Sequence, residues 1–102
     1  MKCLIVSDIE TSREEKVQFL SEMNLFSSIG SAATAEQAMA KLIKYAYGIV
    51  ILDLSASSDA NMALLKAIRA EKIFVCVIML SAENSVEFIS EAFSYGVSDY
   101  IL

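Results

Sequence analysis

The sequence contains no histidine, proline or tryptophan, and its 102 residues include only three glycines and two cysteines. The absence of histidine excludes Ser-His and Cys-His nucleophile pairs and removes the commonest zinc ligand, which excludes most hydrolase mechanisms. Cys3 and Cys76 both lie within apolar runs, and neither has a partner at metal-ligand or redox spacing. We therefore expect both cysteines to be small, buried hydrophobic side chains.

Long hydrophobic runs and an excess of positive charge are also missing. The longest apolar run, which ends at Leu80, is far shorter than the roughly 20 residues that span a bilayer, and the four apolar residues after Lys2 are too few for a secretory signal. Thirteen acidic against eight basic residues give a net charge of −5, which disfavours binding to nucleic acid and to anionic membranes. We expect a cytoplasmic protein that binds neither directly.

Hydrophobic residues are abundant, at 56% of the sequence, and the mean hydropathy is +0.53. This composition excludes a disordered chain, because enough apolar surface is present to build a core. A folded chain of this length hides roughly two thirds of the surface that it exposes when unfolded. We expect residues 1–102 to form one domain.

Short apolar segments alternate with helical patterns along the whole chain. Strands that are almost entirely apolar are typical of a parallel sheet covered on both faces, and right-handed crossovers then lead to an α/β, doubly wound, open sheet. The expected strands are Lys2–Ser7, Ser28–Ala32, Ile49–Asp53, Val75–Leu80 and Asp99–Leu102.

Capping signals place the first two helices. Thr34 and Gln37 have the spacing of a capping box, and Ser12 with Glu15 has the same spacing. Gly48 is expected to end the second helix in a left-handed turn. The side chains expected to face inward are Val17, Leu20 and Met23 in the first helix, and Ala35, Ala38, Met39, Leu42, Ile43 and Ala46 in the second.

Two further helices are expected at about Asp59–Ala70 and Asn84–Tyr95, and Gly96 is expected to end the second of them. Their apolar residues recur at helical spacing, which predicts one inward face on each helix. Those inward side chains are Leu64, Leu65 and Ile68 in the first of the pair, and Val86, Ile89 and Phe93 in the second.

Polar residues interrupt the apolar runs where three of the strands end. Asp8, Asp53 and Ser81 hold these positions, and ligands of such sheets bind beyond the carboxyl ends of the strands. Two ionised carboxylates at one edge need a cation between them, and hard oxygen ligands favour Mg²⁺. The alternative is that each residue only caps the helix that follows it, because Asp and Ser are preferred there.

Four segments of the chain resemble the receiver domain of bacterial response regulators, in the order of that family and across nearly the whole chain. Lys2–Asp8 resembles its first strand with the terminal acid pair, and Gly48–Leu54 resembles the strand that ends in the phosphoacceptor aspartate. Ile78–Glu83 resembles the strand closed by a switch Ser or Thr, and Ala92–Leu102 resembles the path into the fifth strand. The resemblance implies a flavodoxin-like sheet with strand order 2-1-3-4-5.

The resemblance also implies roles for individual residues. Asp53 would accept a phosphoryl group from a sensor histidine kinase or a phosphotransfer protein, while Asp8, Asp53 and the backbone carbonyl of Ser55 would hold Mg²⁺. The Ser81 hydroxyl would donate a hydrogen bond to the new phosphoryl group, and Tyr100 would move with it. A second copy of the chain is a further partner to consider.

Three departures from the family pattern accompany this resemblance. Ser7 stands where the family has the other carboxylate of its acid pair, which should weaken Mg²⁺ binding, and the segment Leu54–Ser58 lacks the usual proline and Asp-Gly turn. The chain also ends one residue before the family's phosphate-binding lysine. We therefore expect a domain that lacks its final helix and is less stable, or more prone to self-association, than a longer version.

These sequence features are compatible with three functional hypotheses. The first is a phosphoacceptor switch, which would not be a metabolic enzyme. The second is a receiver-like module that no longer uses phosphate and acts through protein contacts alone, because Ser7 weakens the ion site. The third is a small flavodoxin-like enzyme or cofactor carrier, although no phosphate-binding loop is visible in the sequence. The fold that they share does not distinguish them.

Overall fold

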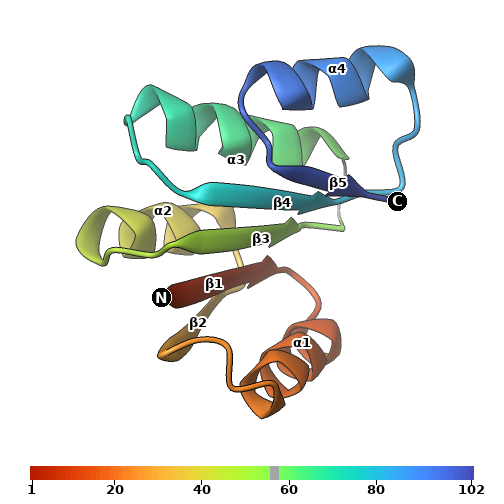
Figure 1. Cartoon of the computed structure of the whole chain (residues 1–102). Coiled ribbons are helices and arrows are strands. Elements are labelled where there is room, and N and C mark those ends of the chain that lie inside the picture. Colours follow the sequence, from red (N-terminus) through yellow and green to blue (C-terminus); the bar gives the residue numbers. More distant parts are fainter. Residues whose placement is uncertain (56–57) are drawn as a thin grey trace.

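A computed structural model describes residues 1–55 and 58–102. In this described part, strands and helices alternate from β1 to β5 (Figure 1). The strands are β1 (Lys2–Ser7), β2 (Ser28–Ala32), β3 (Ile49–Asp53), β4 (Cys76–Leu80) and β5 (Asp99–Ile101). The helices are α1 (Glu10–Glu22), α2 (Ala35–Lys44), α3 (Ser58–Ala70) and α4 (Val86–Ser94).

The strands form one parallel sheet in the order β2-β1-β3-β4-β5, as the resemblance implied. The doubly wound α/β fold is therefore confirmed. All carboxyl ends of a parallel sheet lie at one edge, and here the register places Ser7 of β1 beside Asp53 of β3. The residues that follow these two strands are consequently brought to the same edge.

The main core lies on the face of the sheet that α2, α3 and α4 cover. Alternate residues of the strands point to this face, and the helices bury apolar side chains against them. Leu64, Leu65 and Ile68 of α3 are buried, as predicted. The strand residues in this core are Leu4, Val6, Ala32, Val50, Leu52, Val77 and Met79.

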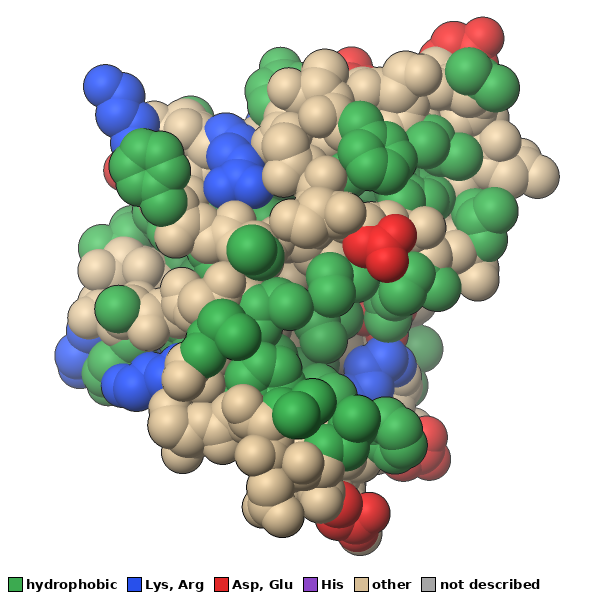
Figure 2. Space-filling model, in the orientation of Figure 1, with side chains coloured by type: hydrophobic (Ala, Val, Ile, Leu, Met, Phe, Trp, Pro, Cys, Tyr) green, Lys and Arg blue, Asp and Glu red, His purple; other side chains and the backbone are tan. Residues whose placement is uncertain are grey.

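The opposite face of the sheet is only partly covered. In the described residues α1 is the one helix on this face, and it packs mainly against β1 and β2. An apolar groove, lined by Phe19, Ile51, Ile78 and Ile101 among others, runs beside it. Figure 2 shows hydrophobic side chains gathered over this part of the sheet, between α1 and α4. Within the described ranges, no helix combines the length and apolarity needed to cross a membrane.

The prediction for the start and inward face of α1 was wrong. The helix begins at Glu10 after Ile9, which makes no side-chain cap hydrogen bond, and the Ser12 hydroxyl instead accepts a hydrogen bond from Lys16 Nζ at 2.6 Å. No residue of α1 is buried, and Met23 is 48% exposed. Helical periodicity identifies residues on one face, but burial requires neighbours on both sides, and α1 lies beside the open groove.

The capping box of α2 is confirmed: the Thr34 hydroxyl accepts from the Gln37 N–H, and the Gln37 side chain accepts from the Ala33 N–H. Gly48 does not end this helix. The helix stops at Lys44, and Gly48 lies against Met1 where a Cβ atom would have no room. Its N–H donates to the Lys2 carbonyl. Ala38 and Leu42 are buried, whereas Ile43 and Ala46 are exposed, so the inward face is narrower than predicted.

Helix α4 begins after the N-cap Ser85, and Gly96, with a φ of +79°, follows its end as predicted. Its inward face was predicted wrongly, because Val86 and Phe93 are exposed. Ala92 is the buried residue of α4.

Two strand bounds also differ from the prediction: β4 begins at Cys76, one residue later, and β5 ends at Ile101, one residue earlier.

One cysteine is buried and the other is exposed. Cys3 in β1 is buried as predicted, and burial raises the pKa of its thiol to about 11. Cys76 is exposed, contrary to prediction, because the first residue of β4 lies on the partly covered face of the sheet. The apolar run did not reveal that this face is open.

This difference predicts selective thiol labelling. At neutral pH, a disulfide reagent should modify Cys76 quickly and Cys3 at least about a hundredfold more slowly, because the thiolate is the reactive form and Cys3 is both buried and weakly ionised. Counting released thiol over time checks this. Cys76→Ser should remove the fast phase, and a fast phase that survives in this variant would contradict the burial of Cys3.

Candidate functional site

Two aspartates follow neighbouring strands at the carboxyl edge of the sheet. Asp53 is the last residue of β3 and lies beside Ser7 in the strand register, and Asp8 follows Ser7 directly. Asp8 Oδ1 accepts hydrogen bonds from the Ser55 N–H at 3.0 Å and from the Ser55 hydroxyl at 2.7 Å. The ends of β1 and β3 are therefore tied together through Asp8 and Ser55.

Asp53 carries an ion pair that the sequence analysis did not anticipate. Lys16 Nζ of α1 lies 2.8 Å from Asp53 Oδ2, and the side chains of the two residues are 29% and 23% exposed, respectively. Arg13, one turn earlier, donates from Nη1 to the Ser7 carbonyl at 2.8 Å. Two basic residues of α1, spaced i and i+3, thus face the end of β1 and β3, and this spacing was the available sequence signal.

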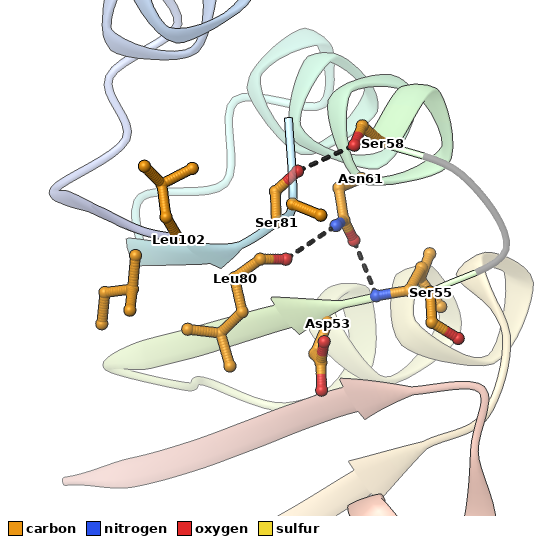
Figure 3. Close-up of a pocket in the computed structure, with 10 residues that line it drawn as sticks. Asp53, Ser55, Ser58, Asn61, Leu80, Ser81 and Leu102 are labelled. Atoms are coloured by element: carbon orange, nitrogen blue, oxygen red, sulfur yellow. Dashed lines mark hydrogen bonds between the residues drawn. The ribbon is translucent and has the colours of Figure 1, made fainter. Parts of the chain in front are cut away.

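Asp53, Ser55 and Ser81 line one pocket of about 410 Å³. Figure 3 shows Asp53 at the end of β3 and Ser81 after β4, with α3 above them. The structure therefore brings the predicted phosphoacceptor and the predicted switch serine to one cavity. Its full lining is Asp53, Leu54, Ser55, Ser58, Asn61, Leu80, Ser81, Ala82, Ile101 and Leu102.

The Ser81 hydroxyl is held by two neighbours. Its oxygen lies 2.8 Å from the hydroxyl oxygen of Ser58 at the start of α3, and it accepts a hydrogen bond from the Glu83 N–H at 3.1 Å (Figure 3). At this distance one hydroxyl donates a hydrogen bond to the other, and either one can be the donor. Any new partner of Ser81 must therefore replace or join Ser58.

Tyr100 lies outside the pocket lining, on β5. Its hydroxyl donates to the Glu83 carbonyl at 2.7 Å, and its ring packs edge-on against Phe88 with the centroids 6.2 Å apart. Since Glu83 also contacts Ser81, one residue separates the hydroxyls of Ser81 and Tyr100 in this chain of hydrogen bonds. A movement of the loop after β4 would change both contacts.

Asn61 of α3 joins the ends of β3 and β4 from within the core. Its side chain is almost fully buried; Oδ1 accepts from the Leu54 N–H at 2.8 Å, and Nδ2 donates to the Leu80 carbonyl at 3.1 Å (Figure 3). Leu54 follows Asp53 and Leu80 precedes Ser81. Asn61 thus fixes the spacing of the two polar strand ends, a role that sequence analysis missed.

The donor set at this edge is suited to a hard cation. Asp8 and Asp53 supply carboxylate oxygens, and Ser55 lies against Asp8. Magnesium characteristically takes one or two protein carboxylates and keeps several waters, so two aspartates fit its chemistry. Within residues 1–55 and 58–102, no three His, Cys, Asp or Glu side chains are placed so that together they could hold a metal ion. The site is therefore suited to an ion that keeps several water ligands, rather than to an ion that protein side chains surround completely.

The family model for the response regulator receiver domain matches residues 3–102. This chain belongs to the response regulator receiver family. Its function is that of a receiver domain in two-component signalling.

Individual proteins are similar to this chain in sequence or in fold. The chain is 31% identical over all 102 residues to the sensory transduction protein LytR of Staphylococcus haemolyticus, covering 39% of that protein. Among solved structures, the chemotaxis protein CheY4 of Vibrio cholerae matches 99% of this chain and 84% of its own, with a TM-score of 0.85 and 24% identity. The response regulator TrrA of Thermotoga maritima, solved with Mg²⁺ and BeF, matches the same shares with a TM-score of 0.77 and 25% identity.

The chain spans about two fifths of the length of the curated relatives that it matches. The receiver assignment therefore concerns this region.

The Asn61 bridge leads to a stability prediction. Asn61→Leu should lower the free energy of unfolding by about 2–4 kcal/mol, because it leaves the buried Leu54 N–H and the half-buried Leu80 carbonyl without this partner. Urea denaturation would measure the change. Asn84→Leu, at an exposed position, is the control and should change stability by less than about 0.5 kcal/mol. If Asn61→Leu also lowers the free energy of unfolding by less than about 0.5 kcal/mol, the two hydrogen bonds of Asn61 do not contribute to stability.

Proposed function

We propose that this domain is a phosphoacceptor switch in which Asp53 receives a phosphoryl group from a phosphohistidine on a sensor histidine kinase or phosphotransfer protein. The observation that carries the proposal is the shared pocket of Asp53 and Ser81, with Asp8 following the neighbouring strand. We propose that residues 1–102 act as one domain in the cytoplasm. The switch would not be a metabolic enzyme.

The reaction requires one nucleophile and several groups that hold charge in place. An Asp53 carboxylate oxygen attacks phosphorus in line, an O–P bond forms, and the N–P bond to the donor imidazole breaks with the electron pair returning to nitrogen. Mg²⁺, when bound, would neutralise charge on the phosphoryl oxygens. Asp8, Asp53 and the Ser55 carbonyl are the residues that we propose to hold it.

The response to phosphorylation follows from the contacts of Ser81. Its hydroxyl would donate to a phosphoryl oxygen in place of its contact with Ser58. The Ser81 hydroxyl accepts from the Glu83 N–H, and the Tyr100 hydroxyl donates to the Glu83 carbonyl, so a shift of Ser81 would reach Tyr100 through Glu83. The new charge on Asp53 would thus alter the surface near α4 and β5.

The Mg²⁺-BeF complex of TrrA supports the proposed cofactor, because that relative shares the fold over nearly the whole of this chain. The specific features of this chain weaken the ion site. Ser7 is a buried hydroxyl where the family has a second acid, and Lys16 already neutralises Asp53. These features favour, as the second candidate, a receiver that acts through protein contacts without phosphate.

Labelling with acetyl phosphate distinguishes the two candidates. With millimolar Mg²⁺, intact mass spectrometry of the wild type should show the addition of a single phosphoryl group, which EDTA prevents. Asp53→Asn should abolish the addition, because the amide is not a nucleophile. Asp59→Asn, an exposed acid at the start of α3, is the matched control and should label normally. If the wild type is never phosphorylated under these conditions, the first candidate is excluded, and a receiver that acts through protein contacts alone is the function that remains.

A further inference from the structure

We propose that Lys16 is a resident counter-ion of Asp53 that competes with the divalent cation and so sets how much Mg²⁺ the site requires. This inference rests on the proposed function, because it concerns the same carboxylates. It assigns a role to a residue of α1 that lies outside the strand ends from which the site was predicted.

The position of the Lys16 ammonium is fixed by two partners. Nζ lies 2.8 Å from Asp53 Oδ2 and donates to the Ser12 hydroxyl, one turn earlier in α1, at 2.6 Å. Neither Lys16 nor Asp53 is more than a third exposed, so solvent screens their attraction less than at an open surface. The Lys16 ammonium is therefore held in a defined position by protein partners, rather than extending freely into solvent.

The charges of four side chains at the ends of β1 and β3 cancel one another. Asp8 and Asp53 contribute two negative charges, Lys16 contributes a positive charge on Asp53, and Arg13 contributes another at the Ser7 carbonyl. A divalent ion that approaches this edge is repelled by both cations of α1, and it shares Asp53 with Lys16.

Ser7 adds to the same effect. Its side chain is buried, its hydroxyl donates to the Ile9 carbonyl at 3.5 Å, and it brings no negative charge beside Asp53. A missing carboxylate and an added ammonium both lower the attraction for Mg²⁺. The edge therefore retains the ligands of an ion site while its net charge is small.

Calorimetric titration of the whole chain with Mg²⁺ tests the inference without any phosphorylation step. Lys16→Met and Lys16→Gln remove the charge, and each should bind Mg²⁺ about three- to tenfold more tightly than the wild type. Lys16→Arg keeps the charge and should bind within about twofold of the wild type. Lys72→Met, the control, removes an equal charge just after the end of α3 that lies away from the pocket, and it should leave Mg²⁺ affinity unchanged.

A double substitution shows whether the effect passes through Asp53. In an Asp53→Asn background the ion pair is absent and only the direct repulsion between Lys16 and the cation remains, so Lys16→Met should raise Mg²⁺ affinity by a smaller factor than it does with Asp53 present. Thermal melting of each variant verifies that it is folded during titration.

The outcomes separate the two proposals. Binding in the Lys16 variants but not in the wild type supports the inference in its strongest form. Equal affinity in the wild type and in both neutral variants overturns the role of Lys16 and leaves the magnesium-dependent switch intact. Absence of binding in every folded variant overturns both, because no cation site then exists for Lys16 to oppose.

Discussion

The parallel pairing of β1 with β3 is the constraint on which the proposed site depends. Its register sets Ser7 beside Asp53, and Asp8 therefore leaves the sheet next to the end of β3. The hydrogen bonds from Ser55 to Asp8 then join the two loops. A slip of one residue would turn Asp53 to the other face of the sheet and separate these groups.

The same edge combines a rigid part with a part that can exchange partners. Asn61, buried in the core, holds the ends of β3 and β4 at a fixed spacing. The hydroxyl pair of Ser58 and Ser81 is different, because a hydroxyl can rotate and change its partner at small cost. A switch needs both: a frame that stays in place and a contact that a new charge can redirect.

The sequence predicted the fold and most of its elements because apolar runs and capping residues are local signals. Thr34, Gln37 and Gly96 behave as their local chemistry requires. Local signals do not report how completely each face of the sheet is covered. This is why Cys76, expected to be buried because it lies in an apolar run, and Met23, placed on an inward face by its spacing, are exposed in the structure.

The proposed site was predictable to a similar extent. Acids and serines directly after apolar strands stand out in the sequence, so Asp8, Asp53 and Ser81 were identified. Lys16 and Asn61 were not, since each contacts a partner on another element. The i, i+3 spacing puts Arg13 and Lys16 on one face of a helix, but it does not show which strand ends that face meets.

The central claim is that one divalent ion binds between the ends of β1 and β3. Paramagnetic broadening by Mn²⁺, used in place of Mg²⁺ and followed on the backbone amide NMR signals, tests it most directly. The account predicts that signals of Asp8, Asp53, Ser55 and their sequence neighbours broaden first, and that excess Mg²⁺ restores them. Broadening that begins at the exposed acids of α1 and α4, with these signals unchanged, would contradict it.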